Sequence, residues 1–210
     1  MISIRIGLLI LILTACFQLQ AQHRVYLIRH AKVDLPPLKW STAKDAQKYK
    51  HQYNIAPVVP FKPKHVLSKL KGTNLTDTIY CSPLPRSQHT AAILFGSKPT
   101  YVVKEVLREI DYKIIPIPLV KLPAGIWFGA SRLVSMIEMQ EEKQAVAEWG
   151  KWIEQKTKSK DIIIVGHGFQ IRETIRFLKK RNWKIIRKEA YRNLSVNCLE
   201  NQNISHHGSK

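Results

Sequence analysis

The chain has 210 residues, of which 45% are hydrophobic and 23% are charged, so its composition is that of a globular protein. This composition argues against a disordered, collagen-like or disulfide-rich chain, and the length favours one domain with an insertion. Lys and Arg number 34, whereas Asp and Glu number 15, which gives a formal net charge of +19. Such an excess predicts a surface that attracts anions: phosphorylated small molecules, nucleic acid or acidic membrane headgroups.

Residues 1–21 have the pattern of an export signal. Arg5 is the only charged residue before Arg24, and residues 6–13 form an unbroken apolar run with one glycine. A cationic start, an apolar core of about 7–15 residues and small residues at the end are typical of such a signal. A transmembrane helix needs roughly 20 apolar residues, so this run is too short for one. We therefore expect a bacterial protein that works outside the cytoplasm, in the periplasm or at a membrane.

Two processing sites fit the end of this segment. Residues 13–16 resemble the lipobox of bacterial lipoproteins, in which Cys16 would be acylated and would anchor the chain to a membrane. Residues 19–21 resemble an ordinary signal-peptidase site, and cleavage there would give a soluble chain that begins at Gln22. The sequence leaves both alternatives open.

The chain has two further cysteines, Cys81 and Cys198. They show no metal-ligand spacing such as C-x-x-C, so we predict no metal site. In an oxidising compartment they could form a disulfide, and two buried free thiols are an equal alternative.

Short apolar runs in the mature chain have the pattern of buried strands. They are residues 25–28, 78–81 and 162–165. Continuous apolar runs of this length suit strands that are covered on both faces by helices. The helices that we expect are residues 85–95, 131–158 and 170–180. A last strand is expected at residues 195–199. This alternation predicts a three-layer α/β/α fold with a mainly parallel sheet.

Two segments lack a clear periodic pattern. Residues 34–64 contain prolines, aromatic side chains and several lysines, and we expect a loop or a small cap insertion there. Residues 114–129 contain prolines that exclude a continuous helix. We expect these two segments to select the substrate of a domain that spans residues 22–200. The polar residues 201–210 are expected to form a frayed tail.

The polar residues that could carry chemistry follow the predicted strands. Arg29 and His30 come directly after the first strand. Ser82 and Arg86 follow the second strand, and His167 lies between two glycines after the third. Ligands of open α/β sheets bind at the carboxyl ends of the strands, so we expect a cationic pocket there. Arginine suits phosphate oxygens and histidine is an accepted covalent nucleophile, so the pattern favours phosphoryl chemistry.

Four motifs resemble, in the same order, those of the histidine phosphatase superfamily, which includes the phosphoglycerate mutases. They are residues 27–31 (Leu-Ile-Arg-His-Ala), 81–91 (Cys-Ser-Pro-Leu-Pro-Arg-Ser-Gln-His-Thr-Ala), 107–110 (Leu-Arg-Glu-Ile) and 165–168 (Val-Gly-His-Gly). Residues 193–196 resemble the closing strand of that family. The resemblance implies a phosphoglycerate mutase-like fold, and it covers residues 25 to about 170.

The resemblance also implies a role for each matched residue. His30 would be the nucleophile that becomes phosphohistidine. Arg29, Arg86 and His167 would hold and neutralise the phosphoryl oxygens, and Ser82 would also bind the phosphate. Neither a cofactor nor a metal is implied.

Glu109 would be the general acid that protonates the leaving oxygen and then the base that activates water. This role requires surroundings that raise its pKa. The glycine that often follows in this motif is replaced, so a solvated Glu109 is the alternative, and Asp111 is then the reserve candidate. The acid-phosphatase branch has Asp directly after the second histidine, whereas this chain has Gly168, which argues against that branch.

The sequence therefore predicts an exported phosphomonoesterase that acts on a phosphorylated small molecule. One alternative is a phosphohistidine or other phosphoprotein phosphatase, because residues 29–32 (Arg-His-Ala-Lys) also resemble that branch. Another is a non-catalytic anion-binding module of the envelope on the same scaffold. The basic run at residues 179–192 could bind an anionic membrane or polymer or form a solvated face. No nucleic-acid partner is predicted, because no recognition motif accompanies the basic residues. The sequence does not specify the oligomeric state.

Overall fold

The computed structural model describes residues 23–70, 77–109, 111–137 and 140–202. The predicted export signal, with Cys16 and both processing sites, lies outside the described residues. Of the predicted tail, only residues 201–202 are described, and Asn201 still belongs to the last strand.

Six strands form one mixed sheet in the order β4-β3-β6-β1-β8-β7. Their bounds are β1 (Arg24–Arg29), β3 (Thr78–Cys81), β4 (Thr100–Val103), β6 (Ile162–Gly166), β7 (Trp183–Arg187) and β8 (Val196–Asn201). Strands β4, β3, β6 and β1 run parallel to one another. Strand β8 is antiparallel to β1 and β7. The predicted mainly parallel sheet is confirmed.

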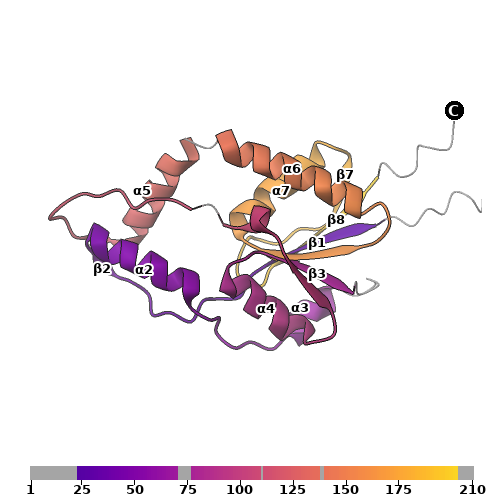
Figure 1. Ribbon diagram of the computed structural model, residues 1–210, viewed down its shortest axis with the longest axis horizontal. Helices are drawn as coiled ribbons and strands as arrows, with labels where there is room; N and C mark the ends of the chain where they lie inside the picture. Colours follow the sequence, from indigo (N-terminus) through magenta and orange to yellow (C-terminus); the bar gives the residue numbers. More distant parts are fainter. Residues whose placement is uncertain (1–22, 71–76, 110, 138–139, 203–210) are drawn as a thin grey trace, which may run out of the picture.

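Helices cover both faces of this sheet (Figure 1). Their bounds are α3 (Lys64–Leu67), α4 (Pro85–Phe95), α6 (Gln140–Lys156) and α7 (Gly168–Lys179). In β6, Ile162 and Ile164 pack with α6 and α7, whereas Ile163 and Val165 pack with α3 and α4. Successive side chains of a strand point to opposite faces, so both faces need apolar residues here. This explains the unbroken apolar run that predicted the strand.

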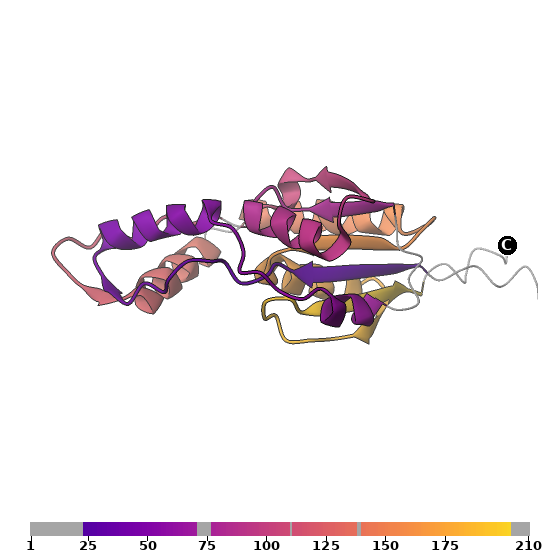
Figure 2. The same ribbon diagram turned by 90° about the horizontal axis from the view of Figure 1, so that it is seen from below.

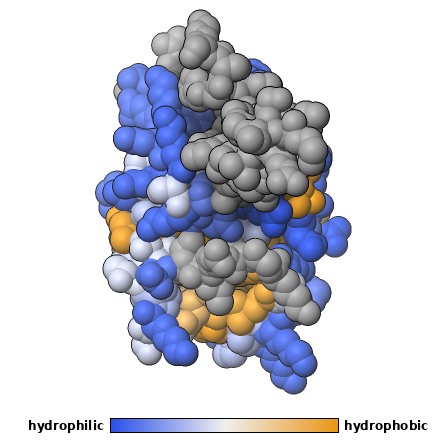
Figure 3. Space-filling view, turned by 90° about the vertical axis from the view of Figure 1, so that its right-hand side faces the viewer, coloured by the Kyte–Doolittle hydropathy of each residue, from blue (hydrophilic) through white to orange (hydrophobic). Residues whose placement is uncertain are grey.

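A cap extends beyond the carboxyl ends of the parallel strands. It consists of residues 34–55 and 111–137, with β2 (Trp40–Ser41), α2 (Ala43–Ile55), β5 (Leu122–Pro123) and α5 (Ala124–Ile137). Strand β2 pairs with β5, and Trp127 donates a hydrogen bond from Nε1 to the Ser41 carbonyl at 2.8 Å. Figures 1 and 2 show α2 and α5 side by side, projecting away from the sheet. The opposite end, seen in Figure 3, shows mostly hydrophilic described residues with apolar patches between them.

Two features of the cap differ from the sequence-based expectations. The prediction of a single helix at residues 131–158 is wrong, because α5 and α6 are separate helices and α5 begins at Ala124. Proline has no N–H group and tolerates the start of a helix, so Pro123 marks this start. The cap segment is also shorter than residues 34–64, because after α2 the chain pairs with the residues that follow β1, through an isolated bridge between Val33 and Val58.

The sequence analysis also missed β4 and β7, which are the two edge strands of the sheet. Strand β7 carries Lys184 and Arg187 from the basic run at residues 179–192, and charged side chains are common on edge strands. Among the described residues, no helix is both long and apolar enough to cross a bilayer.

Candidate active site

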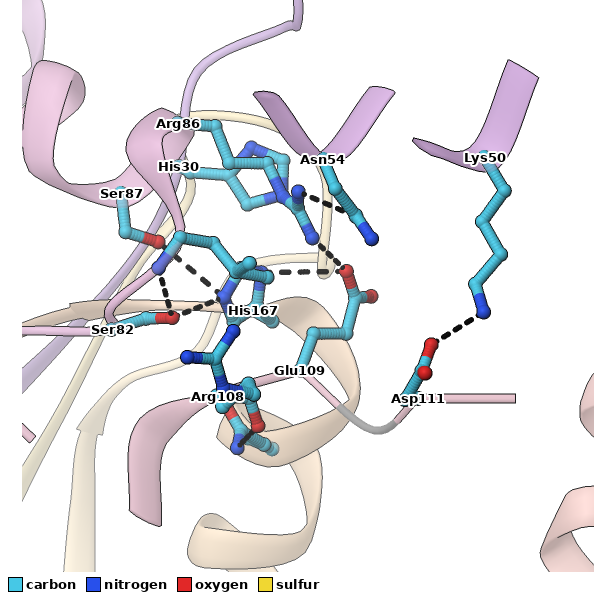
Figure 4. A network of polar contacts seen from close by, with 12 residues as sticks. His30, Lys50, Asn54, Ser82, Arg86, Ser87, Arg108, Glu109, Asp111 and His167 are labelled. Carbon is cyan, nitrogen blue, oxygen red and sulfur yellow. Dashed lines mark hydrogen bonds and ion pairs between the residues drawn. The ribbon is translucent and has the colours of Figure 1, made fainter. Parts of the chain in front are cut away.

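The carboxyl ends of three adjacent strands bring the predicted site residues together. The His30 amide donates to the Gly166 carbonyl at 3.0 Å, and the Ser82 amide donates to the Val165 carbonyl at 3.1 Å. These bonds continue the pairing of β1 and β3 with β6, so the side chains that follow the strands have fixed positions. The ring centroids of His30 and His167 lie 5.1 Å apart (Figure 4).

His30 is held as a neutral imidazole with one nitrogen available. Its side chain is buried, and its Nδ1 lies 2.7 Å from the Ala31 carbonyl oxygen. A carbonyl only accepts, so Nδ1 carries the hydrogen and Nε2 keeps its lone pair. Burial lowers the pKa of His30 to about 4, so the ring is uncharged at neutral pH. A neutral imidazole with a free Nε2 is the form that can attack phosphorus.

Arg86 belongs to the same polar cluster. It lies in the first turn of α4, which begins at Pro85. Its guanidinium is 1% exposed and donates to Asn54 Oδ1 at 3.2 Å and to Glu109 Oε2 at 2.5 Å. It also lies 5.0 Å from the centroid of the Tyr53 ring. A buried guanidinium with this many fixed partners presents its charge in one orientation.

Arg29 comes from the end of β1 and donates from Nη1 to the Tyr191 carbonyl. A Cβ atom at position 168 would lie 3.3 Å from the side chain of Arg29, so glycine there lets the guanidinium cross the start of α7. The Nε atoms of Arg29 and Arg86 are buried and make no hydrogen bond within the described residues. Buried donors of this kind are suited to an anionic ligand.

His167 is the N-cap residue of α7 and is fully buried. Its Nε2 lies 2.7 Å from Ser82 Oγ and 3.5 Å from Ser87 Oγ, and its Nδ1 lies 3.5 Å from Glu109 Oε2. Burial lowers the pKa of His167 to about 3, although Glu109 acts in the opposite direction. The hydroxyl of Ser82 therefore contacts the second histidine, and its predicted role in binding phosphate stays a prediction.

Glu109 follows the 3₁₀ turn at Glu105–Leu107 and lies at the centre of the cluster. Oε2 contacts Arg86 and His167, and Oε1 lies 3.9 Å from Nη2 of Arg132. Burial alone would raise the pKa of Glu109, but the side chains of His167, Arg86 and Arg132 lower it to about 2. The expectation that these surroundings raise its pKa is therefore wrong for the free protein, because the guanidinium groups of Arg86 and Arg132 lie beside the carboxylate.

A cavity of about 380 Å³ lies between the sheet edge and the cap. The cap lines it with aromatic, charged and amide side chains, namely Tyr49, Lys50, Tyr53, Asn54, Asp111, Tyr112, Phe128 and Arg132. Asp111, the reserve acid, is 76% exposed and pairs with Lys50. Asp111 lines the same cavity, but within the described part of the chain it forms no hydrogen bond or ion pair with either histidine.

The sequence analysis missed Tyr53, Asn54 and Arg132. Tyr53 and Asn54 carry no motif, and only the i,i+4 spacing of Tyr49 and Tyr53 on α2 hinted at a common face. Arg132 had a usable signal, because it is the only charged residue in the apolar helix α5. A lone arginine in such a helix must find water, an anion or an aromatic ring, and Arg132 lies 5.0 Å from the centroid of the Tyr112 ring.

Lys32, from the Arg-His-Ala-Lys segment, and the two cysteines complete the residues that the sequence analysis named. Lys32 is exposed. Cys81 and Cys198 are free and buried on β3 and β8, and burial raises the pKa of these thiols to about 12 and about 11. Within the part of the chain that the structure describes, no group of three or more His, Cys, Asp and Glu residues could hold a metal ion.

The sequence matches no protein-family model and none of the curated proteins. Solved structures do resemble it. Phosphoglycerate mutase from Bacillus anthracis gives a TM-score of 0.55 at 17% identity, over 84% of this chain and 87% of that chain. Bacillus stearothermophilus YhfR gives 0.50 at 15% identity, over 75% and 80%. Phosphoserine phosphatase from Entamoeba histolytica, in complex with 3-phosphoglyceric acid, gives 0.49 at 17% identity, over 84% and 89%.

These likenesses concern the fold. The structure of the Bacillus anthracis enzyme shares the arrangement of sheet and helices described above, so the predicted phosphoglycerate mutase-like fold is confirmed. The matching structures are members of the histidine phosphatase superfamily, which is the family that the four motifs resemble.

Proposed function

We infer that this chain is a member of the histidine phosphatase superfamily, and we propose that it hydrolyses phosphate monoesters through a phosphohistidine on His30. The observation that carries the proposal is the state of His30: a buried neutral ring whose Nδ1 donates to a backbone carbonyl and whose Nε2 therefore keeps its lone pair. The buried guanidinium of Arg86 and the ring of His167 lie in the same cluster.

In the first step, Nε2 of His30 attacks the phosphorus and the bond from phosphorus to the leaving oxygen breaks. The N–H groups of Arg29, Arg86 and His167 bind the three phosphoryl oxygens, and the two guanidinium groups balance their charge through the transition state. Protonated Glu109 gives its proton to the leaving oxygen, which departs as an alcohol.

This step requires Glu109 to gain a proton on substrate binding. The phosphoryl group competes with Glu109 for Arg86 and His167, which are the groups that lower its pKa in the free protein. The added negative charge also disfavours the carboxylate, so both effects raise the pKa of Glu109 in the complex. A substrate bound as its monoanion brings the proton that Glu109 takes up.

In the second step, Glu109 is a carboxylate and takes a proton from a water molecule as that water attacks the phosphohistidine. The bond between Nε2 and phosphorus breaks, inorganic phosphate leaves, and His30 returns to its neutral form. The two steps together convert a phosphate monoester and water into an alcohol and phosphate. The chemistry uses only side chains, so we propose that it needs no metal ion.

Trapping of the intermediate tests this proposal. The protein is mixed with a ³²P-labelled phosphomonoester, quenched and mapped, and activity on a panel of phosphomonoesters is measured with a chelator present. We expect acid-labile label on His30, none in His30→Ala, and unchanged labelling in His89→Ala, a matched variant at an exposed histidine of α4. Label on a serine or aspartate, or activity lost to the chelator, overturns the mechanism.

We further propose that the phosphatase is exported, which rests on Arg5 and the apolar run at residues 6–13. The intact mass of natively produced protein distinguishes a chain acylated at Cys16 from one that begins at Gln22. A mass that retains residues 1–21 in the cytoplasmic fraction overturns export.

A further inference from the structure

Large apolar side chains are exposed on the cap. Leu119 is fully exposed, Trp40 is 68% exposed and Ile126 is 51% exposed. We use the name apolar cap surface for these residues together with their exposed apolar neighbours, which are Trp40, Ile117, Leu119, Val120, Ile126, Leu133 and Val134. More than half of the exposed large hydrophobic residues of the described chain belong to this surface.

Backbone pairing brings together the parts of the apolar cap surface that lie around β2 and β5. Trp40 pairs with Pro123, and the Ala124 amide donates to the Lys39 carbonyl at 2.7 Å, so Trp40 lies beside the start of α5. The loop at residues 117–120 leads directly into β5, and it is the extremity of the molecule on the left of Figures 1 and 2.

Helix α5 is apolar on both of its faces. Trp127 is 2% exposed and packs in the small core of the cap. Ile126 and Leu133 are exposed and have a spacing of i and i+7, which places them on one other face of the helix. Val134, which is i+7 from Trp127, is exposed at the border of the buried face. A surface helix of a monomer ordinarily has a polar outer face, and a contiguous exposed apolar patch marks a site of interaction.

The backbone at the extremity of the cap also indicates a site of interaction. Leu119 has a φ of 59°, in the left-handed region that disfavours a residue with a β-carbon. A residue held in this conformation with its side chain entirely in solvent gains nothing from the fold. Such strain is typical of functional segments.

Lysines surround the apolar cap surface. Lys39 directly precedes Trp40 and Lys121 directly follows Val120, and both are exposed. The two cap segments contain seven Lys or Arg residues against three Asp residues. Of these three, Asp45 is bonded to Thr42 in the capping box of α2, and Asp111 is paired with Lys50. The surface thus combines apolar groups and a tryptophan with unbalanced positive charge.

We propose that the apolar cap surface binds the interfacial layer of an anionic lipid bilayer. Aliphatic side chains of the loop and of α5 enter the boundary between headgroups and acyl chains, Trp40 lies at the level of the headgroups, and the lysines contact lipid phosphates. A second copy of the chain fits less well, because two such surfaces face to face bring their lysines together without acidic partners. This binding is separate from the phosphatase reaction.

Vesicle binding tests the proposal. The form that begins at Gln22, which holds every described residue, is sedimented with phosphatidylcholine vesicles with and without phosphatidylglycerol. We expect binding to the anionic vesicles that weakens as salt rises, and that falls roughly tenfold or more in Leu119→Ser/Ile126→Ser and in Lys39→Glu/Lys121→Glu. Ile186→Ser is the matched control, because Ile186 is 43% exposed on β7, and it should bind as the parent does.

Fluorescence locates the contact. Trp127, Trp149 and Trp183 are each less than 5% exposed, and the partly buried Trp152 of α6 packs against the core of the sheet, away from the cap. Quenching by brominated lipids should therefore come mainly from Trp40 and be lost in Trp40→Phe. All of these variants should keep full activity on nitrophenyl phosphate, so a failure of this proposal and a failure of the phosphatase proposal are distinguishable. The absence of sedimentation, equal loss in the Ile186 control, or a dimer that dissociates in Leu119→Ser overturns membrane binding.

Discussion

The cavity has two walls, and they hold their side chains in different ways. On the sheet edge, Arg86 lines the cavity, whereas His30 and His167 lie in the same cluster (Figure 4) without lining it. All three are at most 1% exposed, and their positions follow from strand register and from the first turn of α4. On the cap, Arg132 is 55% exposed, and its guanidinium lies against an aromatic ring and 3.9 Å from the carboxylate of Glu109. The comparison suggests that the sheet edge is preorganised for the reaction, whereas the cap is free to select what enters.

Glu109 is the residue at which the two walls meet. Its Oε2 contacts the sheet edge through Arg86 and His167, and its Oε1 faces Arg132 of α5. Its protonation therefore depends on both walls. A substrate that occupies the cavity changes the charge on each side of this carboxyl at once.

The largest effect that separates the walls is expected from Glu109→Gln. Glutamine keeps the shape of the side chain and removes the transferable proton, so turnover of alkyl phosphates should fall by about 10²–10⁴-fold. Nitrophenyl phosphate has a leaving group that needs no proton, so its turnover should fall much less. Steady-state kinetics on the two substrates measure the difference. Asp111→Asn, at the exposed carboxylate beside Lys50, is the control and should leave the difference between the substrates unchanged.

Equal loss on both substrates in Glu109→Gln would contradict the role of a general acid. It would show instead that the carboxylate only positions Arg86, and a larger loss on alkyl phosphates in Asp111→Asn would then make Asp111 the acid. Proton transfer by Glu109 would then no longer link the sheet edge to the cap.

A smaller effect concerns acid, which should destabilise the sheet edge rather than the cap. Burial lowers the pKa of His30 to about 4 and that of His167 to about 3. Below pH 6.5 the unfolded chain therefore binds protons that the folded protein does not, so stability falls as the pH falls from 6.5 towards these values. The loss at pH 5 should be on the order of 1–2 kcal/mol for each histidine. Glu109 adds to the loss only below pH 4.5, because cations lower its pKa to about 2 in spite of burial.

Urea unfolding at pH 7 and pH 5 measures this dependence. His30→Gln should lose less stability than the parent between the two pH values, because one of the two depressed histidines is gone. His89→Ala, at an exposed histidine, should lose as much as the parent. An identical pH dependence in all three proteins would show that the buried rings are not the groups that titrate.

The sheet edge could be predicted from the sequence because its physical requirements are local. Strands β1, β3 and β6 are covered on both faces, which demands unbroken apolar runs, and the polar residue after each run must lie at the strand end. Helix α4 was placed at its observed bounds because Pro85 and Gly96 mark its two ends.

The cap could not be predicted in the same way. Its core consists of three buried residues, Ala46, Ile114 and Trp127, which come from segments far apart in the chain. Pairing of β2 with β5 also joins distant segments, and two residues in each strand leave no period to detect. The low pKa of Glu109 was missed for a related reason, because Arg132 of the cap contributes to it.

The smallest expected effects are on stability and turnover, and they come from replacing one threonine in each wall. Thr90 is buried and joins the loop after β1 to α4: its Oγ1 accepts from the Ala31 amide at 2.9 Å and donates to the Arg86 carbonyl at 2.6 Å. Thr90→Val leaves the Ala31 amide without a partner, which should cost about 1–3 kcal/mol and lower turnover, because Ala31 also orients His30. Thr42 caps α2 in an exposed capping box, so Thr42→Ala should cost about 1 kcal/mol and leave turnover on nitrophenyl phosphate intact. Urea unfolding and steady-state kinetics on both variants measure these effects. A loss of turnover in Thr42→Ala that matches the loss in Thr90→Val would mean that the cap, like the sheet edge, must be rigid for the reaction.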